Sequence, residues 1–263
     1  MQEAKKDNGR VTKVIVRKSP REIEIMRSAG KITAEALRLA RELTKIGITT
    51  DYLNEEIEKF IISKDAVPVF KGYRGFPKSI CTSINEEVVH GIPSQRRLDE
   101  GDILSIDVGV RYRKYVADAA LTIPVGIISE EAERLLDVCE KSLYLAISVI
   151  KSHEKLSLIS RTIQEFVEEN GYSVVRDYTG HGIGRSMHED PQVPNFVSKS
   201  LLEYDEILMP GVTIAIEPMI CVGKPGTKVL NNRWVVVTKD GELSAHFEHT
   251  VVVTENGAEI LTL

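Results

Sequence analysis

The stretch ILSIDVGVRYRKYVADAALTIPV, residues 103–125, holds two apolar segments separated by four polar or aromatic residues, Arg111–Lys114. In the first segment the side chains alternate, so that Leu104 and Ile106 share one face and Ser105 and Asp107 share the other. Alternation with a period of two is typical of a β-strand. The second apolar segment is also strand-like, so the stretch predicts a β-hairpin.

Each predicted strand of this hairpin carries one aspartate among apolar residues. If the turn centres on Tyr112 and Arg113, Asp107 lies directly opposite Asp118. Two carboxylates that face each other across a strand pair repel. Burial raises that cost, unless one carboxyl group is protonated or a cation lies between them. The expected cation is a divalent metal ion.

Two glutamates follow the same pattern later in the chain. Glu217 ends the apolar run VTIAIE, and Glu248 directly precedes the strand-like run that contains Val251–Val253. A solvated strand end is the simpler explanation for any single acid, but four such acids weaken that explanation. His90, His181 and His188 stand in loop-like sequence as well. Several carboxylates with one or more imidazoles suit two bridged Mn, Fe, Co or Zn ions.

The order of predicted elements repeats once along the chain. Residues 1–10 are expected to form a flexible tail, followed by a short strand over Val11–Arg17. Ser19, Pro20 and Glu22 form a capping box that starts a helix ending near Leu43. A second helix and several strands follow, and then the same order of two helices and strands occurs again. The sequence therefore predicts one α+β domain made of two similar halves.

Composition excludes several classes of protein. The chain has 263 residues and a net charge of −5, with 42% hydrophobic and 28% charged residues, which is typical of a globular protein. The acidic balance argues against a nucleic-acid partner. Three cysteines without a paired spacing, the polar first ten residues and the lack of an apolar stretch near ~20 residues predict a cytoplasmic protein without disulfides or a membrane span.

Seven short motifs in one order resemble the type I methionine aminopeptidases. These motifs are Gly72-Tyr73-Arg74-Gly75-Phe76-Pro77-Lys78, His90-Gly91-Ile92-Pro93, Ser105-Ile106-Asp107-Val108, Gly180-His181-Gly182-Ile183-Gly184-Arg185, His188-Glu189-Asp190-Pro191, Ile216-Glu217-Pro218-Met219 and Glu248-His249-Thr250. The resemblance implies the creatinase/aminopeptidase-like pita-bread fold, an α+β arrangement of two pseudo-symmetric halves with helices packed on a curved, mostly antiparallel sheet. It also implies that residues 11–263 form a single catalytic metallopeptidase domain.

The resemblance assigns a ligand set for two divalent ions, which are Co, Fe, Mn or Zn. The implied ligands are Asp107, Asp118, His181, Glu217 and Glu248. Asp118 and Glu248 would bridge the ions, Asp107 would chelate one, and His181 with Glu217 would complete the other. Glu217 would also shuttle a proton.

The resemblance assigns the substrate-binding residues as well. His90 and His188 would contact the substrate and support the developing negative charge. The methionine pocket would be formed by Tyr73, Phe76, Cys81, Trp234, Phe70 and Met187. A monovalent cation, Na⁺ or K⁺, is expected at backbone carbonyls near Asn85, Glu87 and Ser244.

Four positions depart from the pattern of the family. Alanines flank Asp118 where the family often has Gly before and a hydroxyl residue after. Asp190 stands where Glu is common, and His246 stands where Gln is expected. We expect neither Asp190 nor His246 to touch an assigned ligand.

The resemblance implies an enzyme that removes the initiator methionine from nascent proteins and peptides and prefers a small second residue. A monomer that acts close to the ribosome is expected. Two alternatives stay open. One is an X–Pro aminopeptidase or prolidase of the same fold, although the stretch before the first predicted helix is short for the additional domain of such enzymes. The other is a non-catalytic binding module, which would normally have lost metal ligands.

Overall fold

The computed structural model describes residues 6–7, 10–11 and 15–263. Most of the expected tail therefore lies outside the described residues, as do residues 12–14 of the expected strand. Within the described part, β1 (Lys6–Asp7) pairs antiparallel with β2 (Arg10–Val11). The strand expected over Val11–Arg17 is wrong for residues 15–17, which follow an irregular path. Here Lys18 donates its backbone N–H to the carbonyl of Gly211 in a loop.

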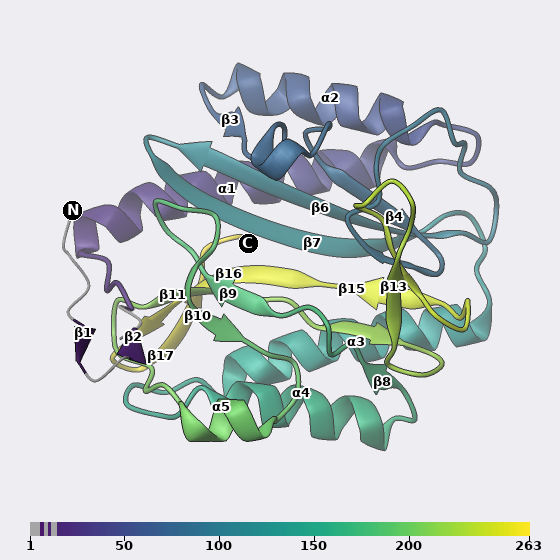
Figure 1. Cartoon of the computed structure of the whole chain (residues 1–263). Coiled ribbons are helices and arrows are strands. Elements are labelled where there is room, and N and C mark those ends of the chain that lie inside the picture. Colours follow the sequence, from purple (N-terminus) through teal and green to yellow (C-terminus); the bar gives the residue numbers. More distant parts are fainter. Residues whose placement is uncertain (1–5, 8–9, 12–14) are drawn as a thin grey trace.

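Nine of the described strands form one large sheet (Figure 1), in which every pairing is antiparallel. Its main path runs β10-β9-β11-β16-β7-β6-β3, with β17 beside β16 and β4 beside β6. The strands are β3 (Val67–Pro68), β4 (Cys81–Ile84), β6 (Ile103–Tyr112), β7 (Tyr115–Pro124), β9 (Gly180–Gly182), β10 (Glu189–Val193), β11 (Thr213–Ile216), β16 (Glu248–Thr254) and β17 (Gly257–Ile260). The two halves of the chain join where β16 pairs with β7.

The β6–β7 hairpin forms with a register two residues away from the expected one. Its turn centres on Arg113–Lys114, so Asp107 pairs with Ala120 and Gly109 pairs with Asp118. Both turn residues have positive φ, 44° and 76°, as a two-residue hairpin turn requires. The predicted direct opposition of the two aspartates is therefore wrong. A slip of two residues nevertheless keeps both side chains on the same face of the sheet.

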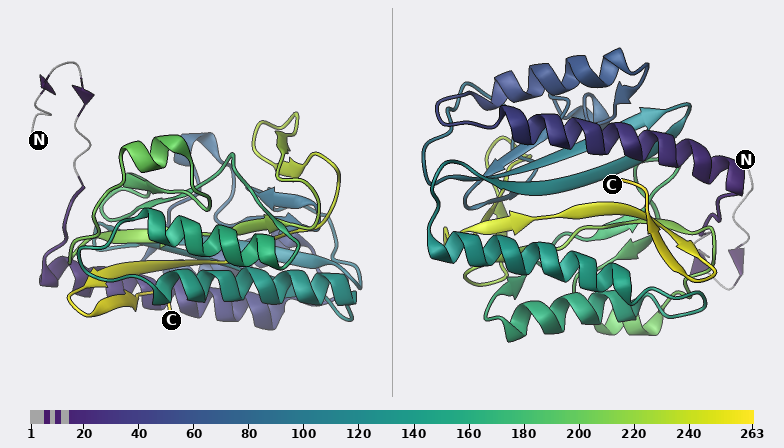
Figure 2. Two further views of the ribbon diagram at one scale, coloured as in Figure 1. Left: turned by 90° about the horizontal axis from the view of Figure 1, so that it is seen from below. Right: turned by 180° about the vertical axis from the view of Figure 1, so that it is seen from behind.

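Helices cover one face of the sheet in two pairs. Figure 2 (right) shows α1 and α2 on one half and α3 and α4 on the other, with the C-terminus between α1 and α3. The helices are α1 (Pro20–Leu43), α2 (Thr50–Ser63), α3 (Glu130–Ser148), α4 (Ser157–Glu169) and the short α5 (Lys199–Glu203). The predicted capping box is confirmed, because Ser19 and Glu22 bond to each other's backbone N–H groups.

Each pair of helices packs a separate apolar core against the sheet. One core joins α1 and α2 to β6 through residues such as Leu37, Ile57 and Leu104. The other joins α3 and α4 to the second half through residues such as Leu143, Ile163 and Val251. Strand β6 is buried on both of its faces, because successive residues from Ile103 to Ile106 and from Val108 to Val110 are all buried.

Two smaller sheets and a short helical turn lie away from α1. One sheet has the order β15-β12-β8, made of Ser244–His246, Met219–Cys221 and Ser173–Val174. The other has the order β13-β14-β5, made of Thr227–Val229, Val236–Thr238 and Glu87–Val89. Figure 2 (left) shows β13 and β14 projecting from the side opposite α1. The turn η1 spans Tyr73–Gly75.

All three cysteines lie in the described part of the chain as buried free thiols. Among the described helices, none combines the length and the apolar character that a bilayer crossing requires.

We expect Gly30→Ala to destabilise the fold. A Cβ at Gly30 would meet the backbone carbonyl oxygen of Leu261 far inside van der Waals contact, so α1 would have to move away from the C-terminal segment. Such overpacking typically lowers the free energy of unfolding by about 1–3 kcal/mol. This exceeds the gain of up to about 1 kcal/mol from replacing a helical glycine by alanine. Urea unfolding measures the difference.

The control is Ser28→Ala, two residues away at a half-buried position of α1, which we expect to be neutral. An unchanged or raised stability of Gly30→Ala would contradict this packing.

Candidate metal centre

A cavity of about 250 Å³ opens between the two halves of the molecule, and one end of it is acidic and the other apolar. Every residue expected to bind the divalent ions or the substrate lines it. These residues are Phe70, Tyr73, Phe76, Cys81, His90, Asp107, Asp118, His181, Met187, His188, Glu217, Trp234 and Glu248. The structure thus brings together residues from both halves of the chain.

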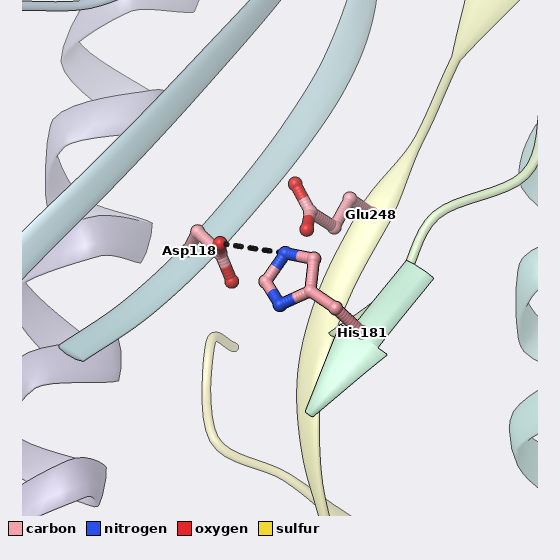
Figure 3. Close-up of side chains that lie close together, drawn as sticks. All are labelled: Asp118, His181 and Glu248. Atoms are coloured by element: carbon pink, nitrogen blue, oxygen red, sulfur yellow. Dashed lines mark ion pairs between the residues drawn. The ribbon is translucent and has the colours of Figure 1, made fainter. Parts of the chain in front are cut away.

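Three side chains at the acidic end point toward one another from three strands of the large sheet (Figure 3). Asp118 lies on β7, Glu248 on β16 and His181 on β9. One nitrogen or oxygen atom from each lies within 4.8 Å of those of the other two. Asp118 and Glu248 are only 2% and 3% exposed. Such a compact and buried set of oxygen and nitrogen donors suits a divalent transition-metal ion.

The orientation of the His181 ring leaves it without an N–H group to donate to the neighbouring carboxylates. Its Nδ1 lies 2.8 Å from the carbonyl oxygen of Gly182, which can only accept, so Nδ1 carries the proton. In the neutral ring Nε2 is then an acceptor, yet it faces Asp118 Oδ2 at 3.5 Å and Glu217 Oε1 at 3.6 Å. Acceptors that face acceptors in a buried site require either a proton or a metal cation between them. A histidine that binds a metal ion through one ring nitrogen commonly donates the N–H of the other ring nitrogen to a backbone carbonyl.

Asp107 and Glu217 complete the acidic end. Asp107 lies on β6, and its Oδ1 is buried without a hydrogen-bond partner among the described residues. Glu217 directly follows β11, and its backbone carbonyl accepts a hydrogen bond from Asn195 Nδ2 at 2.9 Å. The residues therefore fit a group of positive charge, because an orphaned buried carboxylate oxygen is stabilised by a bound cation.

Burial is the main reason why the pKa of every carboxyl group here is raised. The pKa of Asp118 rises from 3.8 to about 6, while a hydrogen bond from Thr250 acts in the opposite direction. Burial, followed by repulsion from neighbouring acids, raises the pKa of Asp107, Glu217 and Glu248 well above the usual range. Burial also lowers the pKa of His181 to about 4, so this ring is neutral near pH 7.

Two further histidines lie beside the acidic cluster without facing it as closely. The Tyr73 hydroxyl lies 2.8 Å from His188 Nδ1. The rings of His181 and His188 are 4.2 Å apart. His90 meets the rings of Tyr178 and Trp234 edge to face, at 5.7 and 6.3 Å. Burial lowers the pKa of both His90 and His188 to about 4, so both rings are neutral near pH 7.

The apolar end of the cavity is built from aromatic and sulfur-containing residues. Phe76 and Trp234 meet edge to face with centroids 5.1 Å apart. Phe70, Cys81 and Met187 belong to the same apolar cluster. The loop that carries Tyr73 and Phe76 depends on Gly72 and Gly75, whose φ values are 84° and 91°.

Sequence reasoning missed some of the residues that line the cavity. His246 was expected to stay clear of the ligands, but its Nε2 lies 3.8 Å from Glu217 Oε2. That expectation is therefore wrong, because the pairing of β15 with β12 brings His246 beside Met219, two residues after Glu217. Arg74, Tyr178 and Met219 also line the cavity. His181 stands in a short strand, although its flanking glycines indicated a loop.

The sequence matches metallopeptidase family M24 over residues 24–255. The methionine aminopeptidase of Clostridium acetobutylicum is 50% identical over 251 residues, which covers 95% of this chain and 99% of that protein. Methionine aminopeptidase 1 of Bacillus subtilis is 48% identical over 249 residues, with coverage of 95% and 99%.

Solved structures show the same relationship. The methionine aminopeptidase from Rickettsia prowazekii superposes with a TM-score of 0.92 and 40% identity, covering 95% of this chain and all of that one. A prolidase from Pyrococcus furiosus has a TM-score of 0.75 at 24% identity and covers 95% of this chain and 66% of that one. At that identity the prolidase shares the fold alone.

We expect the affinity of the site for Mn(II) to rise from pH 5 to pH 8. The raised carboxyl pKa values mean that the ion-free site holds protons near pH 6, and a bound cation must displace them. His181, with a pKa of about 4, loses its proton below this range and contributes little. Titration calorimetry in two buffers of different protonation enthalpy measures the protons released. An affinity that does not change with pH, or binding without proton release, would contradict this electrostatic description.

Proposed function

The chain belongs to metallopeptidase family M24, and from this premise we propose that it hydrolyses the first peptide bond of chains that begin with methionine. The resemblance expected from the sequence motifs is confirmed, as is the α+β pita-bread fold. The alignments with the relatives at about 50% identity cover almost the full length of both chains, so the match is not limited to one part of the chain.

One observation carries the proposal: the lone pair of His181 Nε2 faces two buried carboxylates at one end of a cavity with an apolar opposite end. The acidic end suits a hydrolytic metal centre, and the apolar end suits an unbranched thioether side chain. A free N-terminal amine bound at the acidic end would explain why cleavage is limited to the first residue.

We propose that the acidic end holds two divalent ions, Co, Fe, Mn or Zn, on the five residues named from the sequence. Asp118 and Glu248 would contribute to the binding of both ions, which agrees with their position between β9 and β6 in the sheet. Asp107 lies on the β6 side, and His181 and Glu217 lie on the β9–β11 side. When bound, such ions lower the pKa of water and polarise a carbonyl group.

The side chains around this centre supply the remaining chemistry. Glu217 accepts a proton from the attacking water and returns it to the leaving amine. The Tyr73 hydroxyl donates to His188 Nδ1, which leaves the proton of the neutral ring on Nε2, free to donate to the developing oxyanion. His90 is held beside Tyr178 and Trp234, where it contacts the substrate backbone.

The methionine side chain is proposed to bind among Tyr73, Phe76, Cys81 and Trp234, with Phe70 and Met187 completing the wall. Sulfur packs favourably against aromatic ring edges, and Phe76 with Trp234 offers such edges. A preference for a small second residue is part of the same proposal.

The remaining features expected from the sequence are part of the same proposal. The enzyme would act as a cytoplasmic monomer close to the ribosome, without a nucleic-acid or membrane partner, and residues 11–263 would form its single catalytic domain. A monovalent cation, Na⁺ or K⁺, would bind at carbonyls near Asn85, Glu87 and Ser244. In support, Ser244 donates its backbone N–H to the Asn85 carbonyl at 2.9 Å, so these segments adjoin.

We expect metal-stripped protein to release methionine from Met-Ala-Ser only after Fe(II), Mn(II), Co(II) or Zn(II) is added back without oxygen. Met-Lys-Ser, with a bulky second residue, should be cleaved far more slowly, and Ala-Pro-Ala should stay intact. Quantification of the free amino acid measures all three reactions. Cleavage of Ala-Pro-Ala instead would assign an X–Pro peptidase, and the absence of cleavage with any metal would favour a binding module.

We expect Tyr73→Phe to lower kcat for Met-Ala-Ser by about 10-fold, because the His188 ring loses the hydrogen bond that orients its Nε2, and complete loss of an oxyanion donor typically lowers kcat by about 100- to 1,000-fold. The ring of Tyr73 still stacks on His188, so the methionine pocket keeps its wall. The matched control is Tyr52→Phe on the exposed side of α2, with unchanged kcat. Equal kcat values for the two variants would contradict the role of the hydroxyl.

A further inference from the structure

The buried imidazole of His246 is not used by the proposed mechanism. It lines the cavity, is 2% exposed, and its Nε2 has no hydrogen-bond partner among the described residues. A buried N–H group without a partner costs about 1–3 kcal/mol. A neutral ring with its proton on Nε2 therefore requires an acceptor, and the acidic group that lies within 4 Å of Nε2 is Glu217, with Oε2 at 3.8 Å.

The backbone of His246 is held in place by three other contacts. Its N–H donates to Thr122 Oγ1 at 3.0 Å, and its carbonyl accepts from the same hydroxyl at 2.9 Å. Ser105 Oγ lies 2.9 Å from Thr122 Oγ1 and, because the Thr122 proton is already used, donates to it. β15 also pairs with β12, opposite Met219. These contacts fix the backbone of His246, and with it the Cα from which the side chain extends, at the rim of the acidic cluster.

Glu217 lies between two imidazoles that play different parts. His181 Nε2 faces Oε1 at 3.6 Å and offers only a lone pair, since its proton is on Nδ1. His246 Nε2 faces the other oxygen, Oε2. One carboxylate oxygen is therefore turned toward the proposed metal ligands, and the other is turned toward a potential N–H donor.

We propose that His246 is a positioning residue: its Nε2–H donates to Oε2 of Glu217 and so holds Oε1 toward His181 and the metal site. The present separation is about 0.8 Å longer than a usual N–H···O distance of about 3.0 Å. A small rotation of the glutamate side chain closes that gap. Supporting hydrogen bonds to ligating carboxylates typically change metal affinity by about 10- to 100-fold. The inference rests on the proposed function only in that it takes Glu217 as a metal ligand.

The test compares His246→Leu, which removes the donor, with His246→Gln, which keeps an N–H donor on a side chain of similar reach. Metal-stripped proteins are titrated with Mn(II) in a calorimeter, and the visible absorption of the Co(II) forms is recorded. We expect His246→Leu to weaken Mn(II) binding by about 10-fold or more. His246→Gln should bind Mn(II) nearly as tightly as the unaltered chain and keep its Co(II) spectrum, because the ligands are unchanged.

The matched control is His249→Leu, which removes an imidazole from the same part of the chain but from a position outside the cavity. There His249 contacts Tyr144 and Thr262 instead of the acidic cluster. Its Mn(II) affinity should match that of the unaltered chain. Thermal melting of each variant reports folding, and His246→Gln keeps the comparison decisive if His246→Leu fails to fold.

Two results would overturn the proposal. Equal Mn(II) affinity of folded His246→Leu and the unaltered chain would show that the ring does not support Glu217. Weak binding by both His246 variants, with a changed Co(II) spectrum, would make His246 a direct ligand instead. Failure of the proposed function gives a different result, namely a chain that binds Mn(II) but does not cleave Met-Ala-Ser. In that case the Mn(II) affinities of the variants and the unaltered chain still decide the role of His246.

Discussion

The contact between the lone pair of His181 Nε2 and the carboxylates of Asp118 and Glu217 is the constraint on which the site depends. It places acceptors against acceptors in a region that water does not solvate well, and Glu248 and Asp107 add further negative charge. Without a cation, the carboxyl groups must hold protons, which is the physical meaning of their raised pKa values. The rest of the fold supplies the rigidity needed to keep these groups together.

That rigidity comes from the antiparallel sheet and from the two helix pairs behind it. β7 and β16, one from each half of the chain, pair at the centre of the sheet and carry Asp118 and Glu248. Two separate apolar cores, one for each half, fix these strands from the helical side. The joint between two similar halves thus becomes the place where their acidic residues meet, and the loops of both halves complete the apolar end.

Much of this arrangement follows from the sequence. The capped helix from Pro20 and the two β-strands of residues 103–125 are found where the sequence predicts them, and the residues expected to bind the divalent ions and the substrate line one cavity. The register of the hairpin was less accessible, because Arg113 and Lys114 lack the Asn-Gly or Asp-Gly signal of a two-residue turn. His246 was missed for a different reason. Its approach to Glu217 depends on the pairing of short strands β12 and β15, which no local pattern reveals.

Crystals soaked in Mn(II), with anomalous diffraction measured at the manganese absorption edge, test whether metal ions bind between the two halves. Anomalous scattering locates the ions without reference to activity. We expect two peaks between Asp107 and His181, with Asp118 and Glu248 within bonding distance of both and Glu217 beside the one next to His181. Peaks confined to other parts of the surface, with the five residues hydrogen-bonded to each other or to water, would contradict this expectation.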